Sequence, residues 1–229
     1  MKKVICFSLW GDDERYTHGA LHNVELAKEV YPGWICRFYI GSSTPDEIVS
    51  ELEKNENVEV TRVNEQEDWR STMWRFLAAS DPDVDIVLSR DCDSRLWYRE
   101  KHAVDEWLAS DKSFHIMRDH QYHGVPILAG MWGVRGKKLS EMKVLADNYK
   151  KSNNKIHKQT DQDFLAFSIY PIVKNDSFVH DEFFQRKPFP TKRDSKHFVG
   201  QAYAGSGKIL DDEDTFQNFM KRCKDEGTC

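Results

Sequence analysis

An apolar run followed by two spaced carboxylates stands near the middle of the chain, and it reads Asp85-Ile86-Val87-Leu88-Ser89-Arg90-Asp91-Cys92-Asp93. The run at 86–88 is short, apolar and bounded by polar residues, which predicts a buried strand. Asp91 and Asp93 follow it directly. Two carboxylates one residue apart can converge on one hard divalent cation, Mn²⁺ or Mg²⁺, which prefers oxygen ligands. The alternative is a pair of aspartates that cap a turn.

Strand-like and helix-like segments alternate on both sides of this run. Strands are predicted at 4–10, 34–40, 58–63, 85–88, 114–117 and 127–134, and helices at 20–31, from 44 onward, at 69–77, 103–108 and 139–149. This alternation predicts an α/β fold with a mostly parallel central sheet and helices on both faces. Ligands of such sheets bind beyond the carboxyl ends of the strands. The residues after the strands at 4–10 and 85–88 are therefore the candidates for a site.

Length, charge and cysteine usage narrow the class of protein. The 229 residues carry 33 basic and 38 acidic side chains, a net charge of −5, whereas a nucleic-acid binder needs a basic excess. One domain is expected for 1–229, with a C-terminal extension from about residue 206. No signal peptide or membrane span is recognised, and the five cysteines are scattered without a Cys-x-x-Cys pair. A cytoplasmic protein is expected.

Three motifs together resemble the GT-A glycosyltransferases, especially the retaining group that contains glycogenin and bacterial lipopolysaccharide galactosyltransferases. The motifs are Trp74-Arg75-Phe76-Leu77, the run 82–93 that ends in Asp91-Cys92-Asp93, and Asp161-Gln162-Asp163. The segment 117–133 is also similar to small GT-A proteins of bacteria and large viruses. The resemblance covers about residues 1–205. It implies a GT-A (Rossmann-like) fold and metal-dependent transfer of a sugar from a nucleotide-diphosphate sugar to a hydroxyl of an acceptor such as a glycan, with retention favoured over inversion.

The resemblance also implies roles for individual residues. The end of the first strand would hold the base and ribose, Arg75 the diphosphate, and Asp91 with Asp93 the metal. The acidic turn would lie beside the reacting sugar, with Gln162 near the anomeric carbon and Asp161 or Asp163 as base, nucleophile or hydroxyl ligand. Asp119 would bind donor hydroxyls or serve as a base, and Trp132, which stands between two glycines, is expected to be exposed beside the ligand. The predicted nucleotide-sugar ligands are Ser8, Leu9, Trp10, Gly11, Tyr16, Arg75, Asp91 and Trp132.

A late histidine is expected to complete the metal shell. His197-Phe198-Val199-Gly200 matches the metal-binding motif of the family, but the phosphate-binding Lys that follows there is absent. Ser177-Phe178-Val179 predicts a strand that would deliver His180 rigidly, whereas His197 lies beyond two prolines in a charged loop. We therefore expect His180 as the third ligand, with His197 as the alternative.

Two other classes of function also fit parts of the sequence. A haloacid-dehalogenase-like phosphatase carries Asp-x-Asp after a buried strand, but usually near the start of the chain. A non-catalytic carbohydrate-binding module would explain the seven tryptophans, but not the paired carboxylates or the acidic turn.

Overall fold

A single sheet organises the computed structural model, which describes residues 1–193, 197–210 and 221. The strand order is β3-β2-β1-β4-β6-β5-β7. The strands are β1 (Lys3–Leu9), β2 (Ile35–Ile40), β3 (Val58–Arg62), β4 (Ile86–Ser89), β5 (Phe114–Arg118), β6 (Trp132–Arg135) and β7 (Ser177–Asp181). Within the described residues, β6 alone runs against its neighbours, and the other pairings are parallel.

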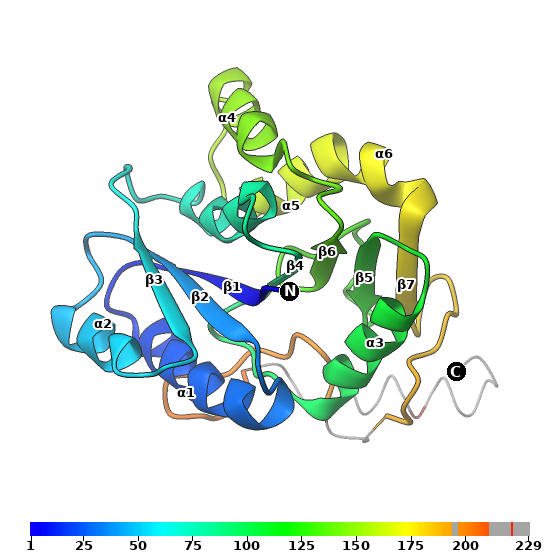
Figure 1. Ribbon diagram of the computed structural model, residues 1–229, viewed down its shortest axis with the longest axis horizontal. Helices are drawn as coiled ribbons and strands as arrows, with labels where there is room; N and C mark the ends of the chain where they lie inside the picture. Colours follow the sequence, from blue (N-terminus) through cyan, green and yellow to red (C-terminus); the bar gives the residue numbers. More distant parts are fainter. Residues whose placement is uncertain (194–196, 211–220, 222–229) are drawn as a thin grey trace.

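Helices cover both faces of the sheet (Figure 1). On one face lie α1 (Glu14–Val30), α2 (Asp46–Glu53) and α3 (Tyr98–Ala109). On the other lie the 3₁₀ helix η1 (Ser71–Ser80), α4 (Met142–Ser152), α5 (Thr160–Phe164) and the π-helical turn η2 (Leu165–Ile169), followed by α6 (Tyr170–Val173) and η3 (Lys174–Asp176). Alternate residues of β1 enter the two apolar clusters, Ile5 and Phe7 facing α1 and Val4 and Cys6 facing η1.

The α/β class and the mostly parallel sheet confirm the expectation from the sequence. Three elements differ in detail. The helix expected at 20–31 begins earlier, at Glu14. The helix expected at 69–77 is a 3₁₀ helix, and the strand expected at 127–134 begins only at Trp132, because the residues before it form turns. The predicted C-terminal extension lies mostly outside the described residues.

The first helix begins close to the carboxyl end of β1. Asp13 caps it, with its Oδ1 accepting a hydrogen bond from the Arg15 backbone N–H at 2.8 Å. Gly11 has a φ of +74°, a conformation that favours glycine, and this residue makes the short turn between β1 and α1. The turn brings the first residues of α1 beside the end of the strand. In the part of the chain that the structure describes, no helix is both long enough and apolar enough to cross a membrane.

Candidate active site

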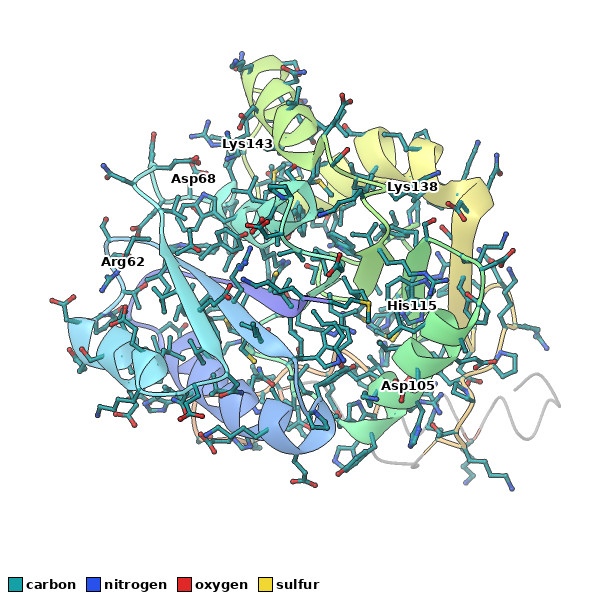
Figure 2. The ribbon with its side chains drawn as sticks, viewed as in Figure 1. Arg62, Asp68, Asp105, His115, Lys138 and Lys143 are labelled. Atoms are coloured by element: carbon teal, nitrogen blue, oxygen red, sulfur yellow. The ribbon has the colours of Figure 1, made fainter. Side chains whose placement is uncertain are left out.

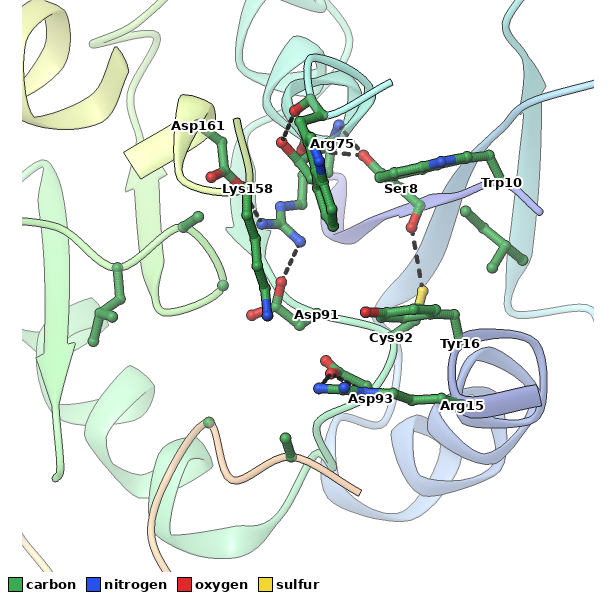
Figure 3. Close-up of a pocket in the computed structure, with 18 of the residues that line it drawn as sticks. Ser8, Trp10, Arg15, Tyr16, Arg75, Asp91, Cys92, Asp93, Lys158 and Asp161 are labelled. Carbon is green, nitrogen blue, oxygen red and sulfur yellow. Dashed lines mark hydrogen bonds and ion pairs between the residues drawn. The ribbon is translucent and has the colours of Figure 1, made fainter. Parts of the chain in front are cut away.

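A cavity of about 500 Å³ opens at the carboxyl ends of β1 and β4, a size suited to a small-molecule ligand (Figure 3). Its walls come from the β1–α1 turn, η1, the turn after β4, the loop before β6, the start of α5 and the segment around Gly200. The residues that line it include Ser8, Leu9, Trp10, Gly11, Asp12, Asp13, Arg15, Tyr16, Trp69, Thr72, Arg75, Asp91, Asp93, Gly130, Lys158, Asp161 and Gln162.

Each carboxylate of the Asp91-Cys92-Asp93 turn is ion-paired with an arginine. Arg75 from η1 contacts Oδ1 of Asp91. Arg15 from the first turn of α1 contacts Oδ2 of Asp93, with its Nε at 2.7 Å. Burial, together with the charge of the neighbouring Asp91, raises the pKa of Asp93, and Arg15 offsets part of this effect. The turn therefore holds two carboxylates close together, and their combined negative charge favours binding of a cation.

Arg75 connects this turn to the acidic turn of α5. Its Nη2 lies 3.0 Å from Oδ2 of Asp161, and its Nη1 donates to the Arg90 carbonyl oxygen at 3.3 Å. The Arg75 side chain is only 5% exposed. Burial opposes its charge, but the carboxylates of Asp91 and Asp161 outweigh burial and raise its pKa. For Asp161, burial is the larger effect and raises the pKa despite Arg75.

The three residues of the acidic turn have different environments. Asp161 and Gln162 line the cavity, whereas Asp163 points to the surface and lies 3.2 Å from Nε2 of His157. The buried Oε1 of Gln162 has no hydrogen-bond partner among the described residues. Gln162 therefore keeps an unpaired amide oxygen that is shielded from solvent, and the carboxylate of Asp161 is already bound by arginine.

The residues predicted at the end of β1 also line the cavity. Ser8 is hydrogen-bonded to η1, its Oγ accepting from the Arg75 backbone N–H at 3.0 Å. Trp10 and Tyr16 are partly buried and provide aromatic surface, and Gly11 donates its N–H to Oγ of Ser43 at 2.7 Å. The structure thus brings the β1 end, Arg75, Asp91, Asp93, Asp161 and Gln162 to one cavity (Figure 3).

Trp132 does not take the exposed position expected of it. Its side chain is 0% exposed and packs between Phe76 and Phe114, with ring centroids 5.4 Å away in each case. The reason is that Trp132 begins β6, which lies between β4 and β5 and is covered by η1. The loop that precedes it lines the cavity instead, through Leu128, Ala129, Gly130 and Met131.

Asp119 does not line the cavity either. Its carboxylate is fully buried and pairs with Arg193 and with Arg99, whose Nε is 2.9 Å from Oδ2. The Val199 backbone N–H also donates to Oδ2, at 2.9 Å. Asp119 therefore joins the end of β5 to the segment near residue 199, and these contacts do not fit the expected role of a base.

His180 is not brought to the carboxylates of the Asp91 turn. Its Nδ1 lies 2.8 Å from Nε2 of His115 and its Nε2 lies 3.1 Å from Oε2 of Glu106, so its ring faces α3. Figure 2 shows His115 on this side of the sheet. His197 has its ring 5.9 Å from Trp97 and does not line the cavity. The third-ligand prediction does not fit these positions. Within the described residues, no three His, Cys, Asp or Glu side chains come together as a metal site.

Several lining residues were not singled out from the sequence, among them Arg15, Trp69, Thr72 and Lys158. Arg15 directly precedes the predicted ligand Tyr16, so its place in the first turn of a helix after a strand end is a usable signal. Lys158 comes just before the acidic turn, from which it enters the cavity (Figure 3). For Trp69 the sequence offers no comparable signal, whereas Gly130 lies in the segment 117–133 that resembles small GT-A proteins.

Comparison with solved structures adds the class of fold. The chain is similar to a glycosyltransferase involved in glycosylation of the major capsid of PBCV-1, with a TM-score of 0.55, 13% identity and coverage of 97% of this chain and 100% of that chain. It is also similar to glucosyl-3-phosphoglycerate synthase from Mycobacterium tuberculosis in complex with uridine diphosphate, with a TM-score of 0.50, 12% identity and coverage of 84% and 72%. The chain has the GT-A fold.

The GT-A fold is not confined to proteins named as glycosyltransferases. The 4-diphosphocytidyl-2C-methyl-D-erythritol synthase from Anaerococcus prevotii matches with a TM-score of 0.50, 11% identity and coverage of 96% of this chain and 97% of that chain. No family model and no curated protein sequence matches the chain. The fold alone therefore does not define the activity, which depends on the residues of the site.

Proposed function

We propose that this GT-A chain transfers a sugar from a nucleotide-diphosphate sugar to a hydroxyl of an acceptor, such as a glycan. The observation that carries the proposal is the joining of two distant motifs in one cavity. Arg75 holds Asp91, which follows β4, and Asp161, which begins α5, at the carboxyl ends of the central strands. A donor bound there would have its diphosphate near Asp91 and its reacting sugar near Asp161.

The donor atoms and the charge of the cavity fit a divalent cation, Mn²⁺ or Mg²⁺. Among the described lining residues, the carboxylates outnumber the basic side chains: Asp12, Asp13, Asp91, Asp93 and Asp161 against Arg15, Arg75 and Lys158. A diphosphate would add further negative charge, so a cation held by Asp91 and Asp93 makes its binding favourable. When bound, the metal would neutralise charge on the departing diphosphate. Phosphate oxygens and water would supply the remaining ligands.

The side chains around the cation have separable tasks in this proposal. The nucleoside lies against the end of β1, where Trp10 and Tyr16 offer aromatic surface. Arg75 fixes the orientation of Asp91 and Asp161 and faces the donor. Lys158 adds positive charge from the segment before α5, on the side of the cavity where Arg75 and Asp91 lie (Figure 3). These contacts would orient the anomeric carbon toward the acceptor hydroxyl.

The surroundings of the acidic turn support a retaining reaction. An inverting enzyme needs a carboxylate free to take the proton of the acceptor. Asp161 is occupied by Arg75, and Asp163 is outside the cavity, whereas Gln162 lines the cavity with a neutral amide that cannot act as a base. Proton NMR of the first-formed product distinguishes the two outcomes. An inverted anomeric centre would assign the role of base to a carboxylate.

Nucleotidyl transfer is the second candidate, because the A. prevotii synthase shares the fold. The phosphatase alternative is weaker, since Asp91, its required nucleophile, is ion-paired with Arg75. A binding module would need neither the paired carboxylates nor their arginines.

Two assays with the full chain separate these functions. The first supplies a panel of nucleotide sugars with Mn²⁺ or Mg²⁺ and measures released nucleoside diphosphate. The second supplies nucleoside triphosphates with sugar 1-phosphates and measures pyrophosphate. Glycosyl transfer predicts metal-dependent turnover in the first assay alone. Turnover in the second assay alone would replace the proposal by nucleotidyl transfer, and binding without turnover would favour a carbohydrate-binding role.

A further inference from the structure

The two arginines that pair with the Asp91-Cys92-Asp93 turn are held in very different ways. Arg75 is 5% exposed and is bound by Asp91, Asp161 and the Arg90 carbonyl, so its guanidinium has partners on several sides. Releasing it would leave the buried carboxylate of Asp161 without its cation, which is costly. Arg75 is therefore a permanent part of the cavity wall.

Arg15 is held much more loosely. Its side chain is 31% exposed, and both its Nε and its Nη2 donate to the same oxygen, Oδ2 of Asp93. Among the described residues, the guanidinium has no other hydrogen-bond acceptor, and it stacks 5.3 Å from the ring of Tyr16. A partly exposed arginine with one partner can exchange that partner readily, provided that the buried carboxylate of Asp93, 12% exposed, gains another cation at the same time.

Arg15 occupies Oδ2, one of the two oxygens that Asp93 could offer to a cation. A divalent ion and a guanidinium on the same carboxylate would repel each other at short range. A diphosphate offers the guanidinium a replacement, because phosphate oxygens suit its planar fork of donors. Cation and diphosphate arriving together would therefore satisfy Asp93 and Arg15 separately.

We propose that Arg15 is an exchangeable counter-ion of Asp93. In the donor-free protein Arg15 neutralises Asp93, and when a nucleoside diphosphate binds with a divalent cation, its guanidinium moves from Asp93 to the diphosphate. This inference rests on the proposed function. Arg15 is then a diphosphate-binding residue. Without nucleotide it competes with the metal for Asp93, and with nucleotide it favours joint binding of the metal and the diphosphate. If the ion pair between Arg15 and Asp93 were purely structural, removing Arg15 would lower only the stability of the fold.

Binding measurements on the full chain test the exchange in two directions. Free Mn²⁺ is followed by its electron paramagnetic resonance signal in a titration without nucleotide. Calorimetry then measures the nucleoside diphosphate, among UDP, GDP, ADP and CDP, that binds wild type most tightly in saturating Mn²⁺. For Arg15→Ala we expect Mn²⁺ alone to bind at least about tenfold more tightly and the nucleotide at least about tenfold more weakly. Arg15→Gln keeps most of the stem and serves as a second variant if Arg15→Ala unfolds.

Arg95→Ala is the matched control for loss of a nearby positive charge. Arg95 follows the same turn but does not line the cavity, and it donates to the Ser94 carbonyl oxygen at 2.9 Å. It should change both affinities by less than about threefold. The exchange is wrong if either Arg15 variant leaves both affinities unchanged, or weakens both together. If wild type binds none of the four diphosphates with Mn²⁺, the proposed function itself fails, and the exchange with it.

Discussion

The carboxylate of Asp91 lies directly against Gly130. A Cβ built on Gly130 would overlap Oδ2 of Asp91 and come within 3.2 Å of its backbone nitrogen. Gly130 belongs to the loop before β6. Because glycine has no side chain, this loop can pack directly against the turn after β4. The position of Asp91 thus depends on a residue without a functional group.

Gly130→Ala should therefore disable the site without replacing any polar atom. The added methyl group would push the Asp91 carboxylate away from Arg75, and we expect transfer to fall at least about tenfold, because small displacements of catalytic groups are costly. Gly124→Ala is the control, since a Cβ there meets Phe184 at an ordinary 3.5 Å. Initial rates of nucleoside diphosphate release check both variants. Equal rates for both would show that Asp91 tolerates displacement.

Removing either carboxylate of the turn should abolish transfer. Asp91→Asn and Asp93→Asn keep the size of the side chain but remove the charge that would hold the cation. We expect Mn²⁺-dependent turnover to fall at least about a hundredfold, far beyond the effect of a surface charge of about 0–1 kcal/mol. Asp83→Asn is the matched control, because Asp83 is exposed just before β4. Wild-type turnover in Asp91→Asn or Asp93→Asn would remove that residue from the site.

The acidic turn of α5 offers a contrast between two aspartates of the same type. Asp161 is buried against Arg75, whereas Asp163 pairs with His157 at the surface. Asp161→Asn should lower turnover at least about tenfold, because it leaves the buried guanidinium short of a charged partner. Asp163→Asn should stay within about threefold of wild type. The two turnover numbers, measured at saturating donor, decide this. A larger effect of Asp163→Asn would return the catalytic role to Asp163.

The parts of the site that could be predicted from the sequence are those set by local pattern. The strand at Ile86–Ser89 and the turn after it place Asp91 and Asp93, because strand ends in a parallel sheet share one edge. The end of β1 follows from the same rule. Arg75 and Gln162 came from the resemblance to GT-A enzymes, and both line the cavity.

The errors concern residues whose environment depends on distant partners. His180 lies in the predicted strand, but alternation along a strand leaves open which side of the sheet each residue faces. It faces α3, where Glu106 and His115 bind it. Trp132 is buried because β6 inserts between β4 and β5, and no local pattern reveals that order. Asp119 is ion-paired with Arg99 and Arg193, which come from other segments of the chain.

The histidines on the α3 side give the protein a pH-dependent stability. His115 is 0% exposed and stacks on Trp107, with ring centroids 5.2 Å apart. Burial, the charge of His180 and that of Arg90 lower the pKa of His115 well below its usual value. Burial also lowers the pKa of His180, although Glu106 opposes this. Both rings therefore resist protonation in the folded protein, whereas in the unfolded chain they bind protons below about pH 6.5.

Because the unfolded state binds more protons in this range, the free energy of unfolding should fall as the pH drops below about 6.5. Each such histidine contributes a slope of up to about 1.4 kcal/mol per pH unit, down to its own pKa in the folded state. His115→Gln removes one of these groups while keeping a polar atom near His180, and we expect the slope to flatten by up to one proton. Urea unfolding between about pH 7.5 and pH 5 measures it. His102→Gln, exposed on α3, should keep the wild-type slope. An unchanged slope in His115→Gln would mean that His115 is protonated in the folded protein as readily as in the unfolded chain, against its burial beside Trp107 and His180.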